Sequence, residues 1–261
     1  MLSLTQGHLR LLEICPRRYQ YTYLEHHTVP TDPAMVERQR WGTEFHRVMQ
    51  QRDLGLPVED VLQSDAALGA AVQSLLTAAP ELFVSPPEGF RQSEHRRTLA
   101  FNGYNLTAIY DLLVMGPTGA QIIDWKTYQH PPQPAQLARD WQTRLYLYLL
   151  AETSPLAPEQ VSMTYWFVAP PLTQAAPKPP SSIAIAYTAA QHRRTRADLQ
   201  RLTDTLSALL LVASDLPKVD ANLGYCTQCP FAVRCQRTSE RYGSEGSLAL
   251  PAIADIAEVP L

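Results

Sequence analysis

The chain has 261 residues, of which 45% are hydrophobic and 18% are charged, and its formal net charge at pH 7 is −3. This balance excludes an intrinsically disordered chain and leaves enough apolar surface for one large domain or two small ones. It also excludes a global basic field, so local patches would have to attract any nucleic acid.

No apolar run approaches the roughly 20 residues that are needed to span a bilayer. The N-terminal stretch "MLSLTQGHLRLLEICPRRYQ" lacks the pattern of a secretory signal. We therefore expect a cytoplasmic protein that does not contact membranes.

The first third of the chain is predicted to be helical. Apolar and aromatic residues recur at helical spacing over residues 3–26, and the period over residues 32–55 predicts a second helix with Pro33 in its first turn. Residues 57–82 predict one or two further helices.

Three β-rich runs follow, over residues 93–101, 104–115 and 120–127. They are joined by the turn signal Asn102-Gly103 and by the stretch "GPTG" at 116–119. Such short strands with tight connections predict an antiparallel meander.

The second half of the chain mixes both kinds of element. A helix is predicted over residues 134–153, strands over 161–170 and 181–188, and a long helix over 189–216. The order of elements predicts an α/β fold with helical flanks, formed as one domain by residues 1–242 and followed by a weakly patterned tail, 243–261.

The strand predicted over 120–127 ends in an acidic and a basic residue. Alternation in a strand places Asp124 and Lys126 on one face, and pairing with the preceding strand can bring Asp111 beside Asp124. Two adjacent carboxylates repel unless a divalent cation lies between them. A lysine there can position water or stabilise charge that develops at phosphorus. The alternative is a surface ion pair, which is the usual meaning of an isolated Asp-x-Lys triplet.

Two further motifs are ordinary when taken singly. His46, in the second predicted helix, offers an imidazole that can complete the coordination of a metal, but a lone histidine on a helix is usually structural. Gln142 and Tyr146 lie four positions apart and therefore share one face of a helix, as in any amphipathic helix.

Together and in this order, the motifs resemble those of the PD-(D/E)XK nuclease superfamily, and within it the RecB-type nucleases. The family pattern is Gly-x-x-x-His on a helix, an Asp in a strand, (Asp/Glu)-x-Lys, and Gln-x-x-x-Tyr on the following helix. It matches Gly42 to His46, Asp111, Asp124 to Lys126, and Gln142 to Tyr146.

The resemblance implies a restriction-endonuclease-like core, with a mixed sheet flanked by helices, and a Mg²⁺ or Mn²⁺ site. The implied metal ligands are His46, Asp111, Asp124 and the backbone carbonyl of Trp125. The implied catalytic residues are Asp111, Asp124, Lys126 as the catalytic lysine, and Gln142 and Tyr146, which would steady the site and the DNA backbone.

Two further positions bear on how well the chain matches the family pattern. Ala108 stands where the family often has Gly three residues before the first Asp, which is a small departure. Glu94 resembles an acidic residue found upstream in many relatives, and we interpret it as a surface charge.

The four cysteines are not evenly distributed. Cys226, Cys229 and Cys235 have the spacing C-x2-C-x5-C, whereas Cys15 lies more than two hundred residues earlier. In a reducing compartment this set is more often a metal site than two disulfides. Both zinc and an iron–sulfur cluster accept four thiolates, so the ligand count leaves the two alternatives open.

The context of these cysteines resembles an iron–sulfur subset of RecB-type nucleases, which includes the AddB nuclease domain and the CRISPR-associated exonuclease Cas-four. In that subset one cysteine precedes the nuclease core and three follow it, as "CPRRYQY" and "YCTQCPFAVRCQ" do here. The resemblance implies a C-terminal iron–sulfur segment in which a [4Fe-4S] cluster on Cys15, Cys226, Cys229 and Cys235 joins the two ends of the domain.

The expected function is therefore a metal-dependent DNA exonuclease that acts on single-stranded DNA or on DNA ends. By family analogy it would serve CRISPR adaptation or recombination repair, with an integrase or recombination proteins as partners. The alternative is a catalytically idle module of the same fold that holds DNA ends for a partner protein.

Overall fold

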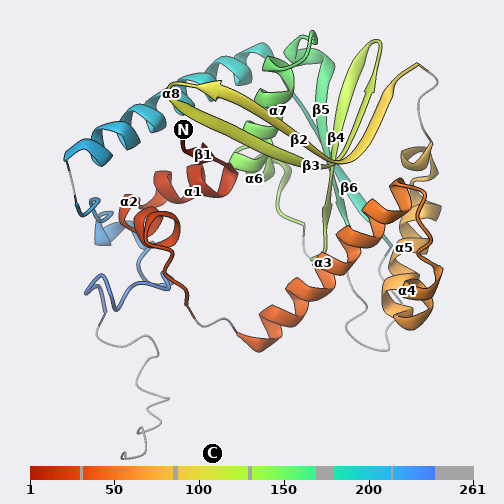
Figure 1. Ribbon diagram of the computed structural model, residues 1–261, viewed down its shortest axis with the longest axis horizontal. Coiled ribbons are helices and arrows are strands. Elements are labelled where there is room, and N and C mark those ends of the chain that lie inside the picture. Colours follow the sequence, from red (N-terminus) through yellow and green to blue (C-terminus); the bar gives the residue numbers. More distant parts are fainter. Residues whose placement is uncertain (30–31, 85–87, 129–130, 169–178, 213, 239–261) are drawn as a thin grey trace, which may run out of the picture. The chain divides into compact units, whose positions relative to one another are not determined.

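The structure is a computed structural model that describes residues 1–29, 32–84, 88–128, 131–168, 179–212 and 214–238 (Figure 1). The helices are α1 (Gln6–Ile14), α2 (Pro16–Tyr19), α3 (Pro33–Asp53), α4 (Glu59–Ser64), α5 (Ala66–Ala78), α6 (Pro134–Leu137), α7 (Trp141–Glu152) and α8 (Ala189–Val212). The strands are β1 (Ser3–Leu4), β2 (Phe90–Phe101), β3 (Tyr104–Gly116), β4 (Gly119–Lys126), β5 (Val161–Phe167) and β6 (Ser181–Ala186). Shorter turns are the π-helical Gln20–Leu24 and the 3-10 helices Pro80–Phe83, Pro158–Gln160 and Ala221–Leu223.

The chain forms two compact units. The larger unit consists of Met1–Glu13 and Pro30–Ser214, and the smaller of Ile14–Val29 and Asp215–Leu261. The larger unit holds the sheet, and the smaller holds the four cysteines. Among the described helices, none combines the length and the apolar character that a membrane crossing requires. The predicted tail, 243–261, lies outside the described residues.

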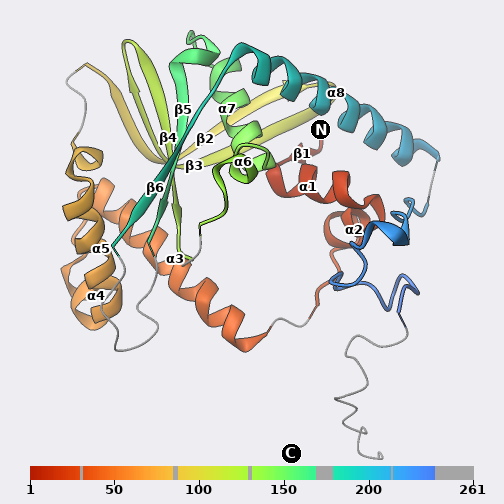
Figure 2. The same cartoon turned by 180° about the vertical axis from the view of Figure 1, so that it is seen from behind.

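Strand β3 is the centre of a six-stranded mixed sheet. Along one edge it pairs with β2 in antiparallel fashion, and along the other it pairs with β1 in parallel near its start and with β4 antiparallel toward its end. Strand β4 pairs in parallel with β5, which pairs antiparallel with β6. Helices flank this sheet in both views (Figures 1 and 2), so the predicted fold class is confirmed.

The meander of β2, β3 and β4 follows from its two turns. Asn102 and Gly103 have positive φ values of 47° and 82°, as a two-residue type I′ hairpin requires, and Phe101 pairs with Tyr104 across them. Strands β3 and β4 are paired as far as the turn at 116–119. The predicted meander is confirmed.

The prediction of one continuous helix over residues 3–26 is wrong. Ser3–Leu4 form β1, and the helix that follows stops at Cys15, whose φ of −162° and ψ of 109° are extended. The reason is Pro16, because a proline ring clashes with a helical conformation of the preceding residue. The helix resumes at Pro16, which is favourable in a first turn.

Two groups of helices pack on the sheet. Helix α7 contacts β2, β3 and β5, and α8 contacts α7. Helices α3 and α5 form a separate core with the ends of β3 and β4, which includes Phe45, Leu75, Leu112 and Trp125.

Strand β3 changes its environment at Asp111. Tyr110 and Leu112 are alternate residues, which lie on one face of a regular strand. Here they contact different helices: the Tyr110 hydroxyl donates to the Tyr146 carbonyl of α7, and Leu112 belongs to the core of α3 and α5. Opposite this point the ladder of β2 is interrupted at Glu94, which has a positive φ of 48°. A left-handed conformation is unfavourable for glutamate and recurs at functional sites. The irregularity therefore marks the place where a site is expected.

Candidate functional site

The two aspartates that the sequence singled out lie side by side. The antiparallel register of β3 and β4 ends at the pair Leu112 and Ile123, and its continuation places Asp111 opposite Asp124. The Trp125 amide donates to Asp111 Oδ2 at 2.7 Å, which holds that carboxylate at the end of the ladder. The side chain of Asp124 is only 2% exposed, and burial together with the charge of Asp111 raises the pKa of Asp124 to about 7.

Lys126 and Gln142 surround the Asp124 carboxylate. Lys126 Nζ lies 2.6 Å from Asp124 Oδ2 and donates to Gln142 Oε1 at 2.9 Å. The Gln142 amide nitrogen in turn donates to Asp124 Oδ1 at 2.5 Å. Burial lowers the pKa of Lys126, but its interactions with Asp124 and the charge of Asp111 outweigh burial, so the pKa lies above its ordinary value and the ammonium stays charged.

His46 reaches the same place from α3. Its Nδ1 lies 3.4 Å from Asp111 Oδ2, and ligand atoms of His46, Glu94 and Asp111 all lie within 4.8 Å of one another. Burial works to lower the pKa of His46, but the carboxylates of Asp111 and Asp124 outweigh it and the pKa is raised.

Glu94 was interpreted from sequence as a surface charge, but it is partly buried and lies in the group with His46 and Asp111. Burial and the charge of Asp111 raise the pKa of the Glu94 carboxyl, which belongs to the group with His46 and Asp111. The sequence did contain a signal, because the two-residue turn at Asn102-Gly103 sets a register in which Glu94 falls opposite Asp111. Like charges directly opposite in a sheet are destabilising, so such a pair requires a compensating charge.

The other two predicted residues lie at the edges of this group. Tyr146 is on the same helix as Gln142, and burial raises its pKa, so the hydroxyl remains protonated. Trp125 packs its side chain in the core of α3 and α5, while its amide orients Asp111. Its carbonyl as a metal ligand stays a prediction.

The donor set fits a hard divalent cation. One lysine, Lys126, and one imidazole, that of His46, lie beside a group of three carboxylates: Glu94, Asp111 and Asp124. Carboxylate oxygens are the ligands that Mg²⁺ and Mn²⁺ prefer, and a histidine is also acceptable to Mn²⁺. His46, Glu94 and Asp111 could hold such an ion, and Asp124 adjoins them.

Mn²⁺ and Mg²⁺ are expected to raise the temperature of thermal unfolding, most strongly above pH 7. Asp124 is a predicted ligand, and its pKa is about 7. Below that pH an ion bound by Asp124 would displace its proton, so apparent affinity is expected to rise with pH and to level off above pH 7. In the metal-free protein the folded state raises the pKa of Asp124 from 3.8 to about 7, so the folded state binds this proton more tightly than the unfolded state. Stability therefore falls as pH rises toward 7. Thermal unfolding of chelator-treated protein on either side of pH 7, with and without metal, checks both. An unchanged unfolding temperature at every pH would contradict a cation site.

Gly42 allows α3 to approach the end of β4. A Cβ atom at this position would lie 2.8 Å from Thr127 Oγ1. Gly42→Val is therefore expected to destabilise the protein by about 1–3 kcal/mol through overpacking, and Thr127→Ala in the same chain should recover part of the loss. Denaturant unfolding measures both, with the exposed Arg38→Val as the control for a branched residue in α3. Equal losses at Gly42 and Arg38 would mean that the close approach is unimportant.

The smaller unit brings the four cysteines to one cavity. Cys15, Cys226, Cys229 and Cys235 are free thiols and line it together. Burial and the charge of Cys229 raise the pKa of the Cys235 thiol. Arg18 also lines this cavity, and its Nε is buried without a hydrogen-bond partner among the described residues. An orphaned cationic donor beside four thiols fits an anionic metal–thiolate group.

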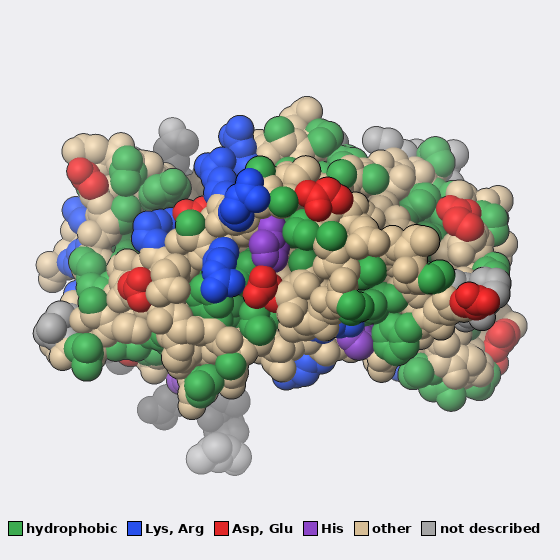
Figure 3. All heavy atoms as spheres, turned by 90° about the horizontal axis from the view of Figure 1, so that it is seen from above, with side chains coloured by type: hydrophobic (Ala, Val, Ile, Leu, Met, Phe, Trp, Pro, Cys, Tyr) green, Lys and Arg blue, Asp and Glu red, His purple; other side chains and the backbone are tan. Residues whose placement is uncertain are grey.

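Basic side chains gather on the surface seen from above, beside a histidine (Figure 3), on the side where α8 lies in Figure 1. Helix α8 carries Arg193, Arg194 and Arg196, which are exposed, and Arg196 lies 3.6 Å from Glu152. Arg96 is exposed in a groove that it lines with Tyr146. This groove therefore connects a basic residue with a predicted site residue.

Comparison with known proteins gives matches over most of the chain. A family model described as the PD-(D/E)XK nuclease superfamily matches residues 3–236. No curated protein matches the chain. The crystal structure of SSO0001 is 14% identical with a TM-score of 0.41, covering 90% of this chain and 86% of that chain. A structure named "Putative exonuclease", from Eubacterium rectale, is 8% identical with a TM-score of 0.47 and 80% coverage of each chain.

Proposed function

The chain belongs to the PD-(D/E)XK nuclease superfamily, and from that premise we propose that it is a metal-dependent DNA exonuclease, which hydrolyses phosphodiester bonds in single-stranded DNA or at DNA ends. The observation that carries the proposal is the meeting of Asp111, Asp124, Lys126 and His46 at one place. These residues come from two strands and a helix. Glu94 of a third strand, β2, adds a third carboxylate, and neither burial nor strand pairing alone requires three carboxylates there.

In the proposed reaction the residues divide into ligands of the ion and a lysine that stabilises charge. His46, Glu94, Asp111 and Asp124 would hold the divalent ion, together with the predicted Trp125 carbonyl. When bound, this ion would polarise a phosphoryl oxygen and lower the pKa of a bound water. Lys126 is fixed by Asp124 and Gln142, and its ammonium would stabilise the negative charge that develops on the phosphate.

Gln142 has a positioning task, because it bonds both the carboxylate of Asp124 and the ammonium of Lys126. Tyr146 lines a groove together with Arg96, where it would contact the DNA backbone. Phosphate contacts of this kind carry no base identity, so we expect little sequence preference.

The four cysteines of the smaller unit would hold a [4Fe-4S] cluster with a structural role. The shared cavity and the orphaned Arg18 Nε support this assignment. Cys15 and Cys235 are more than two hundred residues apart, so the cluster would close a very long loop. We further propose a cytoplasmic enzyme that serves CRISPR adaptation or recombination repair, with an integrase or recombination proteins as partners.

Cleavage of end-labelled DNA by anaerobically purified protein tests the proposed function. Single- and double-stranded substrates would be incubated with Mn²⁺, with Mg²⁺ and with a chelator. The expected result is degradation from the ends that requires metal. Bound but uncut DNA in every metal would contradict the proposal and favour the idle DNA-binding module.

A further inference from the structure

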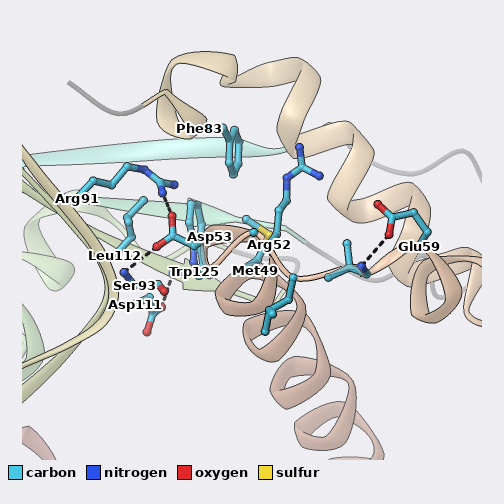
Figure 4. Close-up of a pocket in the computed structure, with 13 residues that line it drawn as sticks. Met49, Arg52, Asp53, Glu59, Phe83, Arg91, Ser93, Asp111, Leu112 and Trp125 are labelled. Atoms are coloured by element: carbon cyan, nitrogen blue, oxygen red, sulfur yellow. Dashed lines mark hydrogen bonds and ion pairs between the residues drawn. The ribbon is translucent and has the colours of Figure 1, made fainter. Parts of the chain in front are cut away.

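A cavity of about 390 Å³ opens beside the candidate metal site, between the end of α3, the turn Pro80–Phe83 and the sheet (Figure 4). Asp111 lines this cavity and also belongs to the group with His46 and Glu94. The volume falls in the range of about 300–1,000 Å³ that is usual for small-ligand sites. A molecule in the cavity would therefore neighbour whatever the metal site binds.

The inner end of the cavity is buried and polar. Arg91 and Asp53 form an ion pair there, both side chains being about nine-tenths buried, and the Ser93 amide donates to Asp53 Oδ2 at 2.9 Å (Figure 4). Ser93 as a residue is 9% exposed, and its buried Oγ has no hydrogen-bond partner among the described residues. A buried hydroxyl without a partner, lining a cavity, is a donor and acceptor that a ligand can satisfy.

The walls and the rim are suited to a flat ring. Met49, Leu112 and Trp125 are buried and give the cavity an apolar side. At the solvent end the exposed Arg52 lies over the ring of Phe83, with its guanidinium carbon 5.8 Å from the ring centroid. Aromatic rings and guanidinium planes are the groups on which nucleobases stack.

The charges decide which part of a nucleotide fits. The cation of Arg91 is neutralised by Asp53, and Glu59 and Asp111 add negative charge to the lining. A phosphate would be repelled from the inner end, whereas the uncharged base and sugar would not. The proposed divalent ion at Asp111 would offset this negative charge, so the phosphate would stay at the ion while the base and sugar occupy the cavity.

From this arrangement we infer that the cavity receives the terminal nucleoside of a DNA strand, with the base on Phe83 and Arg52 and a polar group of the nucleoside on Ser93. The inference rests on the proposed nuclease function and deepens it. Because buried residues close the inner end, a continuing strand cannot pass through the cavity. A strand end enters such a cavity without the rotation out of the strand that an internal nucleotide would need, so the cavity would favour ends and set the step at one nucleotide.

Cleavage of linear and covalently closed circular single-stranded DNA of one sequence tests the inference. The wild-type protein should release mononucleotides from the linear form and leave the circle almost uncut. Phe83→Leu keeps apolar packing but removes the aromatic face, and Arg52→Ala removes the guanidinium plane. Each should lower kcat/KM on linear DNA about tenfold or more, with the unfolding temperature measured alongside. Arg38→Ala, an exposed arginine on the same helix, is the matched control.

The inference would be overturned if wild-type protein cut circles as fast as linear strands, or if both cavity variants cut linear DNA at the wild-type rate. A separate measurement keeps it distinct from the proposed function. Calorimetric titration of dAMP into Lys126→Ala protein with Mn²⁺ should show binding that Phe83→Leu in the same chain weakens about tenfold. If neither the wild-type protein nor the variants cut DNA, the nuclease proposal fails. Binding of dAMP, or its absence, would still show whether the cavity receives a nucleoside.

Discussion

Lys126→Ala is expected to abolish DNA cleavage, with a loss of at least about 10²–10³-fold in kcat, while the protein still folds and binds DNA. Among the described residues, Lys126 is the only lysine at the carboxylate cluster. Its Nζ lies 2.6 Å from Asp124 Oδ2 and 2.9 Å from Gln142 Oε1. Without it, Asp124 can take up a proton, since its pKa is already raised to about 7. The fold therefore has a way to tolerate the substitution.

Single-turnover cleavage of end-labelled DNA, measured beside an equilibrium binding assay, checks this result. Arg38→Ala, which removes one positive charge from an exposed position of α3, should cut at the wild-type rate. If Lys126→Ala cut normally, Lys126 would have no catalytic role and its bonds to Asp124 and Gln142 would be structural. If it neither folded nor bound DNA, Lys126→Arg would separate loss of charge from loss of the amine.

Cys229→Ser is expected to give a colourless and poorly folded protein. The smaller unit has a small core, in which Tyr21, Phe231 and Cys235 are the buried members. Metal–thiolate bonds that close a loop of more than two hundred residues would contribute several kcal/mol to its folding. Loss of one ligand removes this contribution and exposes the remaining thiols to oxidation.

Visible absorption, together with iron and sulfide analysis of anaerobically purified protein, measures the outcome. Gln228→Ala, an exposed neighbour of Cys229, should keep the brown colour and the wild-type unfolding temperature. A brown, soluble Cys229→Ser protein would remove Cys229 from the ligand set. Colourless wild-type protein that contains zinc would replace the cluster by the zinc alternative, without affecting the larger unit.

Local patterns in the sequence predicted most elements of the larger unit, but they missed the short strand β1 and the break between α6 and α7. Strand alternation, helical period and the Asn102-Gly103 turn depend on interactions between residues close in the chain, and they predicted the meander correctly. The same turn placed Glu94 opposite Asp111. Charge and exposure are properties of the folded chain, however, so sequence alone left Glu94 as a surface residue.

The sequence by itself therefore determined the class of fold, the order of its main elements and, apart from Glu94, the residues that meet at the candidate site. Only the tertiary structure decided that α3 carries His46 to Asp111 and that the end of the same helix, with Arg52 and Asp53, forms a cavity next to it. The position of α3 depends on nonlocal burial, such as the packing of Phe45 with Trp125 and the close approach of Gly42 to Thr127. Contacts of this kind join residues far apart in the chain, and no local period encodes them.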